Sequence, residues 1–548
     1  MMRIFLLSSL ILSCFGFKSE VEISEYQYQL PVLKNKENNP ILRVKITADD
    51  DGLTLSNVRF STKGTTDLGD IKSAKLYYYG QDSLPGKMED IESRLYASVN
   101  DVGKKIVFSG NQKLNKGDNF FWLSFELEEN ADLANFVDAT LVATEIDGKK
   151  FRGKTKSNDL KQRIGIAVRK HNQDKVHTSR IPGLATTNEG TLIAVFDARY
   201  ESGRDLQGHI DIGIHRSEDG GQTWEPIQIV MDMGEWGDLP QKFNGVSDAG
   251  ILVDRNTGDI YIAGLWMHGL LDKNGNWIEG LDEESEEWDH QWRNKASQPG
   301  FDVKQTSQFL IVKSTDDGKT WSKPVNVTKM GKKEEWWLWA PAPGQGITLE
   351  DGTLVFPTQG RDKNGHPFSN ITYSKDGGKT WISTNPAVSE GTTECMAVEL
   401  TDGSVMLNMR ANSNRGDTTS TNGRAIAVTK DLGETWTEHP TSHNALPEPV
   451  SMASIIRHDY KKGNSIQPFM LFSNPDSKTH RNRLSVKVSD NDGENWDRYP
   501  TLMLDELNSR GYSCLTSIDN ETIGILYESS QADMVFQTVT IKELTNKN

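Results

Sequence analysis

This chain of 548 residues has few cysteines, no long apolar run and no surplus of basic residues. Its three cysteines are too few for a scaffold stapled by disulfides. No segment reaches the roughly 18 apolar residues of a membrane-spanning helix. The net charge of −16 argues against nucleic-acid binding, which needs clustered Lys and Arg. No group of ligating side chains stands out as a catalytic metal site, and we expect no cofactor.

The first residues predict export. Arg3 precedes a short apolar stretch at 4–13, which is the pattern of a signal peptide over residues 1–21. The sequence ILSC, which ends at Cys14, also fits a bacterial lipoprotein signal with a lipid anchor on that cysteine. A lipoprotein signal and an ordinary cleaved signal peptide both remain open. In either case we expect the periplasm, the cell surface or secretion.

Two regions with different patterns follow the signal. Residues 22–155 carry alternating and aromatic runs between Gly- and Asp-rich turns, which predicts an all-β sandwich. Its aromatic runs, Tyr77–Tyr79 and Phe120–Trp122, are either carbohydrate-binding platforms or part of the sandwich core. A polar stretch at 154–163 reads as a linker to a second domain at 164–545.

The second domain repeats. Six short apolar strands each follow a polar turn, at 189–199, 257–266, 351–361, 402–410, 463–472 and 520–528. A turn with the pattern Ser/Thr-x-Asp-x-Gly-x-Thr-Trp, called an Asp box, follows each of the first five, at 217–224, 314–321, 374–381, 429–436 and 489–496. Repeated units of a few short strands predict a six-bladed β-propeller. We expect the run at 533–542 to close the ring.

The Asp boxes themselves predict structure rather than catalysis. Their Asp suits a turn in which a carboxylate accepts backbone N–H bonds, and their Gly supplies a positive φ. The last copy has Asn491 in place of Asp, and Asn can make a similar turn. Five copies of one motif are not expected to share one catalytic role.

Charged residues end several of the repeated strands. Arg199, Arg410 and Glu528 are such residues. We take these strands to be the innermost of each blade, so their ends should meet near the propeller axis. The sequence therefore predicts a charged pocket built from distant segments, to which Arg180 in SRIPGL also belongs.

These motifs together resemble the bacterial exo-α-sialidases (neuraminidases) of glycoside hydrolase family 33. The resemblance rests on Arg180-Ile181-Pro182, two later arginines, and Glu and Tyr in the family's order, and it covers nearly all of the mature chain. It implies that Arg180, Arg410 and Arg481 clamp the substrate carboxylate, since planar guanidinium groups match carboxylates in charge and shape. Arg483 competes with Arg481 for the third place.

The resemblance also implies the catalytic residues. Tyr512 in GYSCLT corresponds to the nucleophile, and Glu394 in TTECMAVEL to the base that takes its proton. Asp205 in GRDLQGHIDI corresponds to the acid that protonates the leaving oxygen, with Asp211 as its local competitor.

Three further positions carry substrate-binding roles by the same resemblance. Glu528 orients Arg180, while Arg199 and Asp248 line the sugar pocket; for the last two, a structural ion pair is the alternative. If Glu394 faces the pocket from a strand, Cys395 faces away, so we expect buried free thiols rather than a disulfide with Cys514.

The resemblance implies a metal-independent retaining exo-sialidase, most simply a monomer. Its substrates would be sialylated glycoproteins, glycolipids and oligosaccharides. A trans-sialidase or an intramolecular trans-sialidase would keep the same core residues, and a glycan-binding propeller without catalysis would be expected to lose them.

An insertion at 267–303, acidic and rich in Trp, is either a solvated loop or a flap over the pocket rim.

Overall fold

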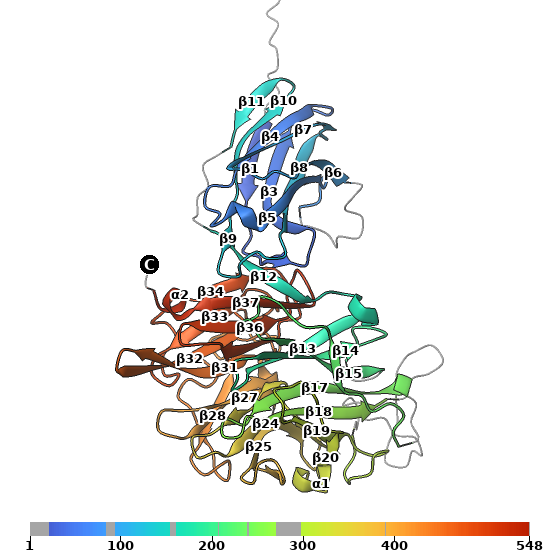
Figure 1. The fold of residues 1–548 in the computed structure, drawn as a ribbon, viewed down its shortest axis with the longest axis vertical. Coiled ribbons are helices and arrows are strands. Elements are labelled where there is room, and N and C mark those ends of the chain that lie inside the picture. Colours follow the sequence, from blue (N-terminus) through green and yellow to red (C-terminus); the bar gives the residue numbers. More distant parts are fainter. Residues whose placement is uncertain are drawn as a thin grey trace, which may run out of the picture. The chain divides into compact units, whose positions relative to one another are not determined.

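A computed structural model describes residues 21–83, 94–153, 160–205, 208–237, 241–269, 297–388 and 391–546 (Figure 1). The signal segment, most of the linker and most of the 267–303 insertion lie outside these ranges. The chain divides into two compact units. Two short segments within the range assigned to the sandwich, Tyr28–Asn39 and Glu126–Val137, group with the second unit.

The first unit is a β-sandwich of two antiparallel sheets. One sheet has the order β1 (Val21–Tyr26), β3 (Asn39–Ala48), β8 (Gly117–Leu127), β5 (Ile71–Tyr78), β6 (Leu95–Val99). The other has the order β11 (Lys149–Arg152), β10 (Thr140–Ile146), β4 (Thr54–Ser61), β7 (Lys105–Lys113). Tyr77, Tyr79, Phe120 and Trp122 are all less than 10% exposed, so these aromatic side chains fill the core and offer no platform to a sugar.

The second unit is a six-bladed β-propeller with almost no helix in its described parts. The first blade comprises β13 (Thr178–Thr186), β14 (Leu192–Arg199), β15 (Ile210–Ser217) and β16 (Gln228–Met231). The second comprises β17 (Asn244–Val253), β18 (Ile260–His268), β19 (Gln308–Ser314) and β20 (Val325–Asn326). The third comprises β21 (Leu338–Pro341), β22 (Gly344–Gln345), β23 (Ile347–Thr348), β24 (Leu354–Arg361), β25 (Pro367–Ser374) and β26 (Ile382–Ser383). Blades four and five comprise β27 (Thr392–Glu399), β28 (Val405–Ala411), β29 (Ala425–Thr429), β30 (Thr437–Glu438); and β31 (Ser454–Lys462), β32 (Ser465–Pro475), β33 (Leu484–Ser489), β34 (Leu502–Asp505).

The sixth blade joins the two ends of the propeller sequence. Its strands β35 (Ser513–Ser517), β36 (Thr522–Tyr527) and β37 (Met534–Thr540) come from the end of the chain. Its fourth strand is β12 (Gln162–Arg169), which pairs antiparallel with β37. β12 also pairs parallel with the short strand β2 (Val32–Lys34) and antiparallel with β9 (Phe136–Val137). The run at 533–542 thus closes the ring, and it does so through the strand that precedes the first blade.

The repeated strands that the sequence reveals are not the innermost ones, and that prediction was wrong. They correspond to β14, β18, β24, β28, β32 and β36, each the second strand of its blade. The first strands lie around the centre, where β13 contacts both β17 and β35. The inner strands lack the turn that made their neighbours recognisable, because irregular segments of variable length precede them.

The Asp boxes connect the third and fourth strands of five blades. In the first, Asp219 accepts a hydrogen bond from the Ser217 hydroxyl at 2.8 Å and others from the backbone and hydroxyl of Thr223 at 2.9 and 2.6 Å. In the fifth, Asn491 accepts from the Ser489 hydroxyl at 2.9 Å and from the Asn495 backbone at 3.1 Å. The predicted structural role of these turns is confirmed.

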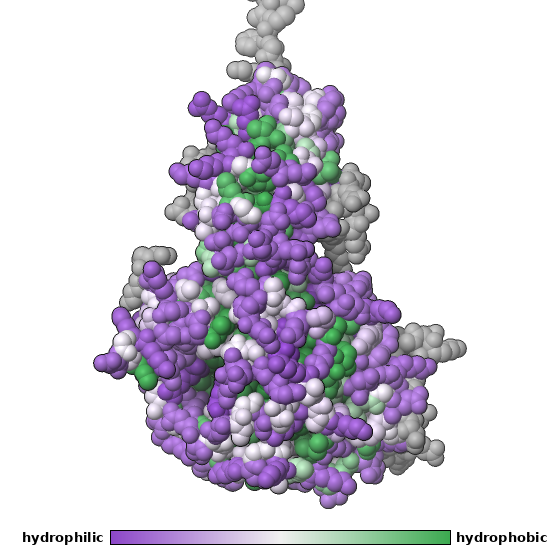
Figure 2. Space-filling model, in the orientation of Figure 1, coloured by the Kyte–Doolittle hydropathy of each residue, from purple (hydrophilic) through white to green (hydrophobic). Residues whose placement is uncertain are grey.

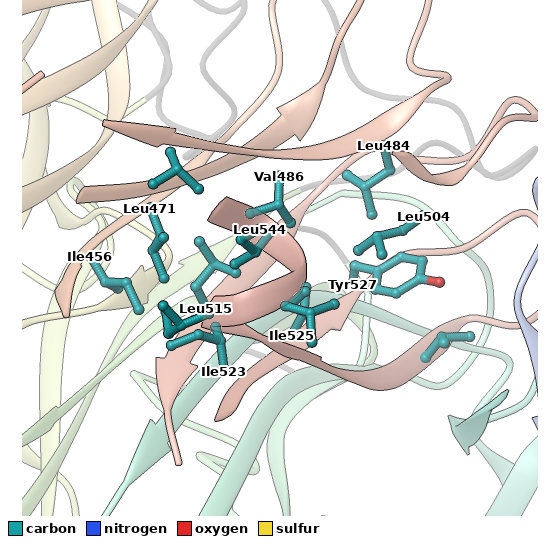
Figure 3. Packing of buried hydrophobic residues seen from close by; sticks show 14 of the residues in the cluster. Ile456, Leu471, Leu484, Val486, Leu504, Leu515, Ile523, Ile525, Tyr527 and Leu544 are labelled. Atoms are coloured by element: carbon teal, nitrogen blue, oxygen red, sulfur yellow. The ribbon is translucent and has the colours of Figure 1, made fainter. Parts of the chain in front are cut away.

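Apolar side chains pack between neighbouring blades. Figure 3 shows one such layer, in which Leu471 and Val486 of the fifth blade meet Leu515 and Ile525 of the sixth, and Leu544 of the short helix α2 (Ile541–Thr545) joins them. A second short helix, α1, covers Thr328–Gly331. Each blade is therefore held by its neighbours, and the ring's closure completes the core.

Hydrophilic residues predominate on the face shown in Figure 2. Among the described helices, none is both long and apolar enough to cross a membrane. Cys395 and Cys514 are both buried and free, as predicted.

Candidate active site

Backbone irregularities occur at or beside three predicted residues, Arg180, Asp248 and Glu394. The antiparallel register shifts between Arg180 and Gly183 in β13, between Ser247 and Gly250 in β17, and between Thr392 and Cys395 in β27. Such bulges re-aim side chains and occur beside active sites. Ile181 and Asp248 have φ values of 62° and 57°, a left-handed conformation that strains non-glycine residues.

Arg180 forms a buried ion pair with Glu528. Its Nε and Nη2 donate to the two Glu528 oxygens at 2.6 and 3.3 Å, although the residues are far apart in sequence. The same carboxylate accepts the backbone N–H groups of Ile181 and Tyr512, each at 3.1 Å. Burial raises the pKa of Glu528, but these contacts outweigh burial and lower the pKa below its usual value. Glu528 therefore orients Arg180 and fixes the strand ends around it.

Tyr512 lies immediately before β35 and bonds to Glu394. Its hydroxyl donates to Glu394 Oε1 in a short hydrogen bond, and Arg410 Nη1 donates to the same hydroxyl at 3.0 Å. Arg410 also donates to Glu394 Oε2 at 2.6 Å. Burial, and secondly the Glu394 carboxylate, raises the pKa of Tyr512 far above its usual value, so the phenol is neutral at physiological pH.

Arg481 completes the arginine set. The guanidinium carbons of Arg180 and Arg481 each lie 5.4 Å from the centre of the Tyr512 ring. Arg481 donates to the backbone carbonyls of Arg510 and Val450 at 3.0 and 2.8 Å, and no carboxylate lies within ion-pair distance among the described residues. Its competitor Arg483 is exposed, whereas Arg481 lies against the Tyr512 ring, as Arg180 does.

Asp205 lies in the loop between β14 and β15. Its carboxylate accepts from Arg199 Nη2 at 2.8 Å, and its side chain is 52% exposed. Burial acts to raise the pKa of Asp205, but Arg199 and Arg180 outweigh it and lower the pKa. The competitor Asp211 is buried on β15 and lies 3.3 Å from His209 Nε2, a partner that occupies it structurally.

His209, Asp211 and Asp232 also bring their potential ligand atoms within 4.8 Å of one another. Hydrogen bonds already engage this group, since Asp232 accepts from Gly234 and Gln241. We assign it no metal.

Asp248 and Arg199 meet around a residue that the sequence interpretation missed. Asp197 is fully buried and accepts from Arg199 Nη2 at 2.7 Å, from the Ser247 hydroxyl at 2.6 Å and from the Asp248 backbone at 3.1 Å. Burial and then three neighbouring carboxylates raise the pKa of Asp248 well above its usual value. The continuous apolar run Leu192–Phe196 in β14 could have revealed Asp197 as a charge on a buried strand.

All nine predicted site residues therefore lie at one end of the propeller, on every blade except the third. The hydroxyl–carboxylate pair, the loop that carries Asp205 and the arginines together define a class: a propeller enzyme that acts on an anionic ligand.

Comparisons with known proteins agree with this class. The family model for a BNR repeat-like domain matches residues 181–498, and the model for the N-terminal domain of BNR-repeat neuraminidase matches residues 18–150. A sialidase of Bacteroides fragilis (strain YCH46) is 40% identical over 538 residues, which cover 94% of each chain. The chain therefore belongs to the BNR-repeat sialidases, which are glycoside hydrolases.

Solved structures extend the comparison. The Hadza microbial sialidase Hz136 is 36% identical with a TM-score of 0.84, over 95% of this chain and all of that one. The intramolecular trans-sialidase from Ruminococcus gnavus has a TM-score of 0.53 at 18% identity, over 69% of this chain and 98% of its own, which shows a shared fold alone.

Proposed function

We propose that this sialidase hydrolyses terminal α-linked sialic acids from glycoproteins, glycolipids and oligosaccharides, with retention of configuration through a covalent intermediate on Tyr512. The observation that carries the proposal is the position of the Tyr512 hydroxyl, which is bonded to Glu394 and Arg410 while two further guanidinium groups flank its ring. A carboxylate clamp beside an activated hydroxyl suits a sugar with a carboxylate on its anomeric carbon.

A tyrosine nucleophile follows from electrostatics. The anomeric carbon C2 already carries a carboxylate, which would repel a carboxylate nucleophile. The neutral Tyr512 phenol avoids this repulsion, and Glu394 accepts its proton as the Oη–C2 bond forms. The three arginines stay paired with the substrate carboxylate while C2 becomes planar and positive, so the transition state keeps its stabilisation.

Asp205 supplies the other proton. It protonates the glycosidic oxygen as the C2–O bond breaks. Later it accepts a proton from the water that attacks C2, while the C2–Oη bond breaks and Glu394 returns its proton to the Tyr512 oxygen. Arginines lower the pKa of Asp205 in the free enzyme. A substrate carboxylate on Arg180 offsets part of that positive field, and the leaving group shields the loop from water. Both effects raise the pKa toward that of a working acid.

Proton NMR of a cleaved α-sialoside tests the reaction. The α-anomer of free sialic acid should appear first and then mutarotate, because two displacements retain configuration. Early β-anomer would contradict the tyrosyl intermediate. Transfer of the sugar to an added acceptor, or an anhydro product, would instead identify a trans-sialidase or its intramolecular form. Binding of the sialoside without release of sialic acid would identify a glycan-binding propeller without catalysis.

We also propose that the chain is exported through residues 1–21, since its substrates are found on cell surfaces and secreted molecules. Mass spectrometry of the mature protein should show a processed N-terminus, with a lipid if Cys14 is the anchor. An intact first residue in a protein from its own host would contradict export by this segment.

A further inference from the structure

Arg510 lies at the site, but its side chain has no role in the fold or in the proposed reaction as described so far. It lies two residues before Tyr512, and its guanidinium makes no hydrogen bond or ion pair with any residue that the structure describes. Its Nη1 is buried without a partner. Leaving a buried donor unpaired is unfavourable. A group that persists in this state is placed to meet a partner from outside the chain.

The surroundings of Arg510 show where that partner would lie. A Cβ atom added to Gly203 would be only 3.1 Å from Arg510 Nη2, so the guanidinium packs against the loop that carries Asp205 two residues later. Burial, and then the nearby positive charge of Arg180, lowers the pKa of Arg510, though a guanidinium stays charged at physiological pH. Arg510 therefore lies between the carboxylate clamp and the proton-donating loop.

Two arginines of the site have no carboxylate of the described residues at ion-pair distance. The other three, Arg180, Arg199 and Arg410, face a carboxylate of the protein, as described above. Arg481 donates only to backbone carbonyls, and Arg510 donates to no described residue, although Glu528 and Asp533 lie near enough to act on its charge. In the proposed clamp, the carboxylate of one sialic acid pairs with Arg481 and leaves Arg510 without a bonded partner. The group that leaves is bonded through the oxygen that Asp205 protonates, so it lies along the loop beside Arg510.

We propose that Arg510 binds an acidic group on the leaving part of the substrate, most simply the carboxylate of a second, linked sialic acid. This inference rests on the proposed hydrolysis and adds a specificity determinant to it. A sulfate ester on the leaving sugar offers related chemistry, but its tetrahedral oxygens fit a planar guanidinium differently from a carboxylate.

Three substrates with the same terminal sialic acid test the proposal. Their leaving groups are a neutral sugar, a second sialic acid and a sulfated sugar. For Arg510→Gln we expect kcat/KM to fall about tenfold on the sialic-acid leaving group and less than about twofold on the neutral one, the loss of one charge-assisted contact. A larger loss on the sulfated sugar would identify sulfate as the preferred group and overturn the choice of carboxylate.

Two variants separate binding from structure. Arg510→Lys keeps the charge and should retain most of the preference, whereas Arg255→Gln, at an exposed arginine outside the site, should change none of the three rates. An equal loss on all three substrates would overturn the proposal, because it would place Arg510 in the shared part of the reaction. No loss would overturn it as well. Wild-type cleavage of the neutral substrate tests the proposed function separately.

Discussion

Carboxyl groups serve two regions of this propeller in opposite ways. In the Asp boxes, each carboxylate takes its partners from within four residues, as Asp376 does from Ser374 and Thr380. In the active site, Glu528 bonds to Arg180 and Glu394 bonds to Tyr512, partners from opposite ends of the propeller sequence or from another blade. The first arrangement makes a turn, and the second makes a pocket.

The carboxyl groups of the Asp boxes and those of the active site differ in burial. The Asp-box carboxylates are exposed, and local hydrogen bonds lower the pKa of Asp376 to about 2. Glu528 is buried, so a single lost partner would leave a charge without solvation. Changes in the active site should therefore have large effects on catalysis or stability, whereas changes in one turn should have small ones.

Tyr512→Phe should cause the largest loss of activity. Without the hydroxyl no bond to C2 can form, and we expect kcat/KM to fall by about a thousandfold or more, measured as release of sialic acid. Tyr527→Phe is the matched control, since this buried tyrosine on β36 bonds to Gln537 away from the site. Retained activity in Tyr512→Phe would require a different nucleophile.

The loss of activity on removal of the Asp205 carboxyl, the proposed acid, should depend on the leaving group. For Asp205→Asn we expect about a hundredfold loss or more on sugar leaving groups, which need a proton, and a much smaller loss on an aryl sialoside. Steady-state kinetics with both substrates measure the ratio. Equal losses would contradict proton donation, and a loss in Asp211→Asn instead would reassign the acid.

Glu528→Gln tests the buried pair. We expect the free energy of unfolding to fall by about 3 kcal/mol at neutral pH, since Arg180 loses its charged partner. Denaturant unfolding measures this change. The folded pKa of Glu528 is below its usual value, so the wild type has this stability above about pH 4.3 and loses it as pH falls. The variant should lack that pH dependence; an unchanged profile would show that the pair contributes little.

The smallest effect should appear in the Asp boxes. Asp376 has a folded pKa of about 2, so its charge contributes stability above about pH 4 that is lost as pH falls toward 2. Asp376→Asn should remove this acid dependence and leave kcat/KM unchanged, and Asn491→Asp should introduce it in the fifth turn. Thermal unfolding between pH 2 and 6 measures both. Any loss of activity in Asp376→Asn would contradict a purely structural turn.

Local patterns predicted the blades better than the strand order within them. The Asp box and the turn before each second strand are regular, which is why the count of six blades follows from the sequence. The inner strands β13, β17 and β27 carry bulges and no common turn, so no period marks them. The sandwich aromatics left two interpretations open, since alternation alone does not say which face of a strand is covered.

Some of the site residues could be predicted from the sequence, and others could not. The resemblance located Arg180, Glu394 and Tyr512, and the structure brings them together. The sequence interpretation missed Asp197 and Arg510, because their positions depend on contacts with other elements. Asp197 contacts Ser247, and Arg510 packs against Gly203. Physical reasoning from a single sequence identifies charges at strand ends but not the partners that they meet across the ring.

The composite sixth blade has a consequence for biosynthesis. β12 precedes the first blade in the chain, yet its pairing with β37 has to wait until the end of the chain has been made. Arg180 follows β12 closely, while Tyr512 and Glu528 precede β37. A chain that ends before the sixth blade therefore lacks a closed ring, and it cannot form the contacts of Tyr512 with Glu394 and of Glu528 with Arg180. The site of this glycosidase is completed only when the last blade has been made.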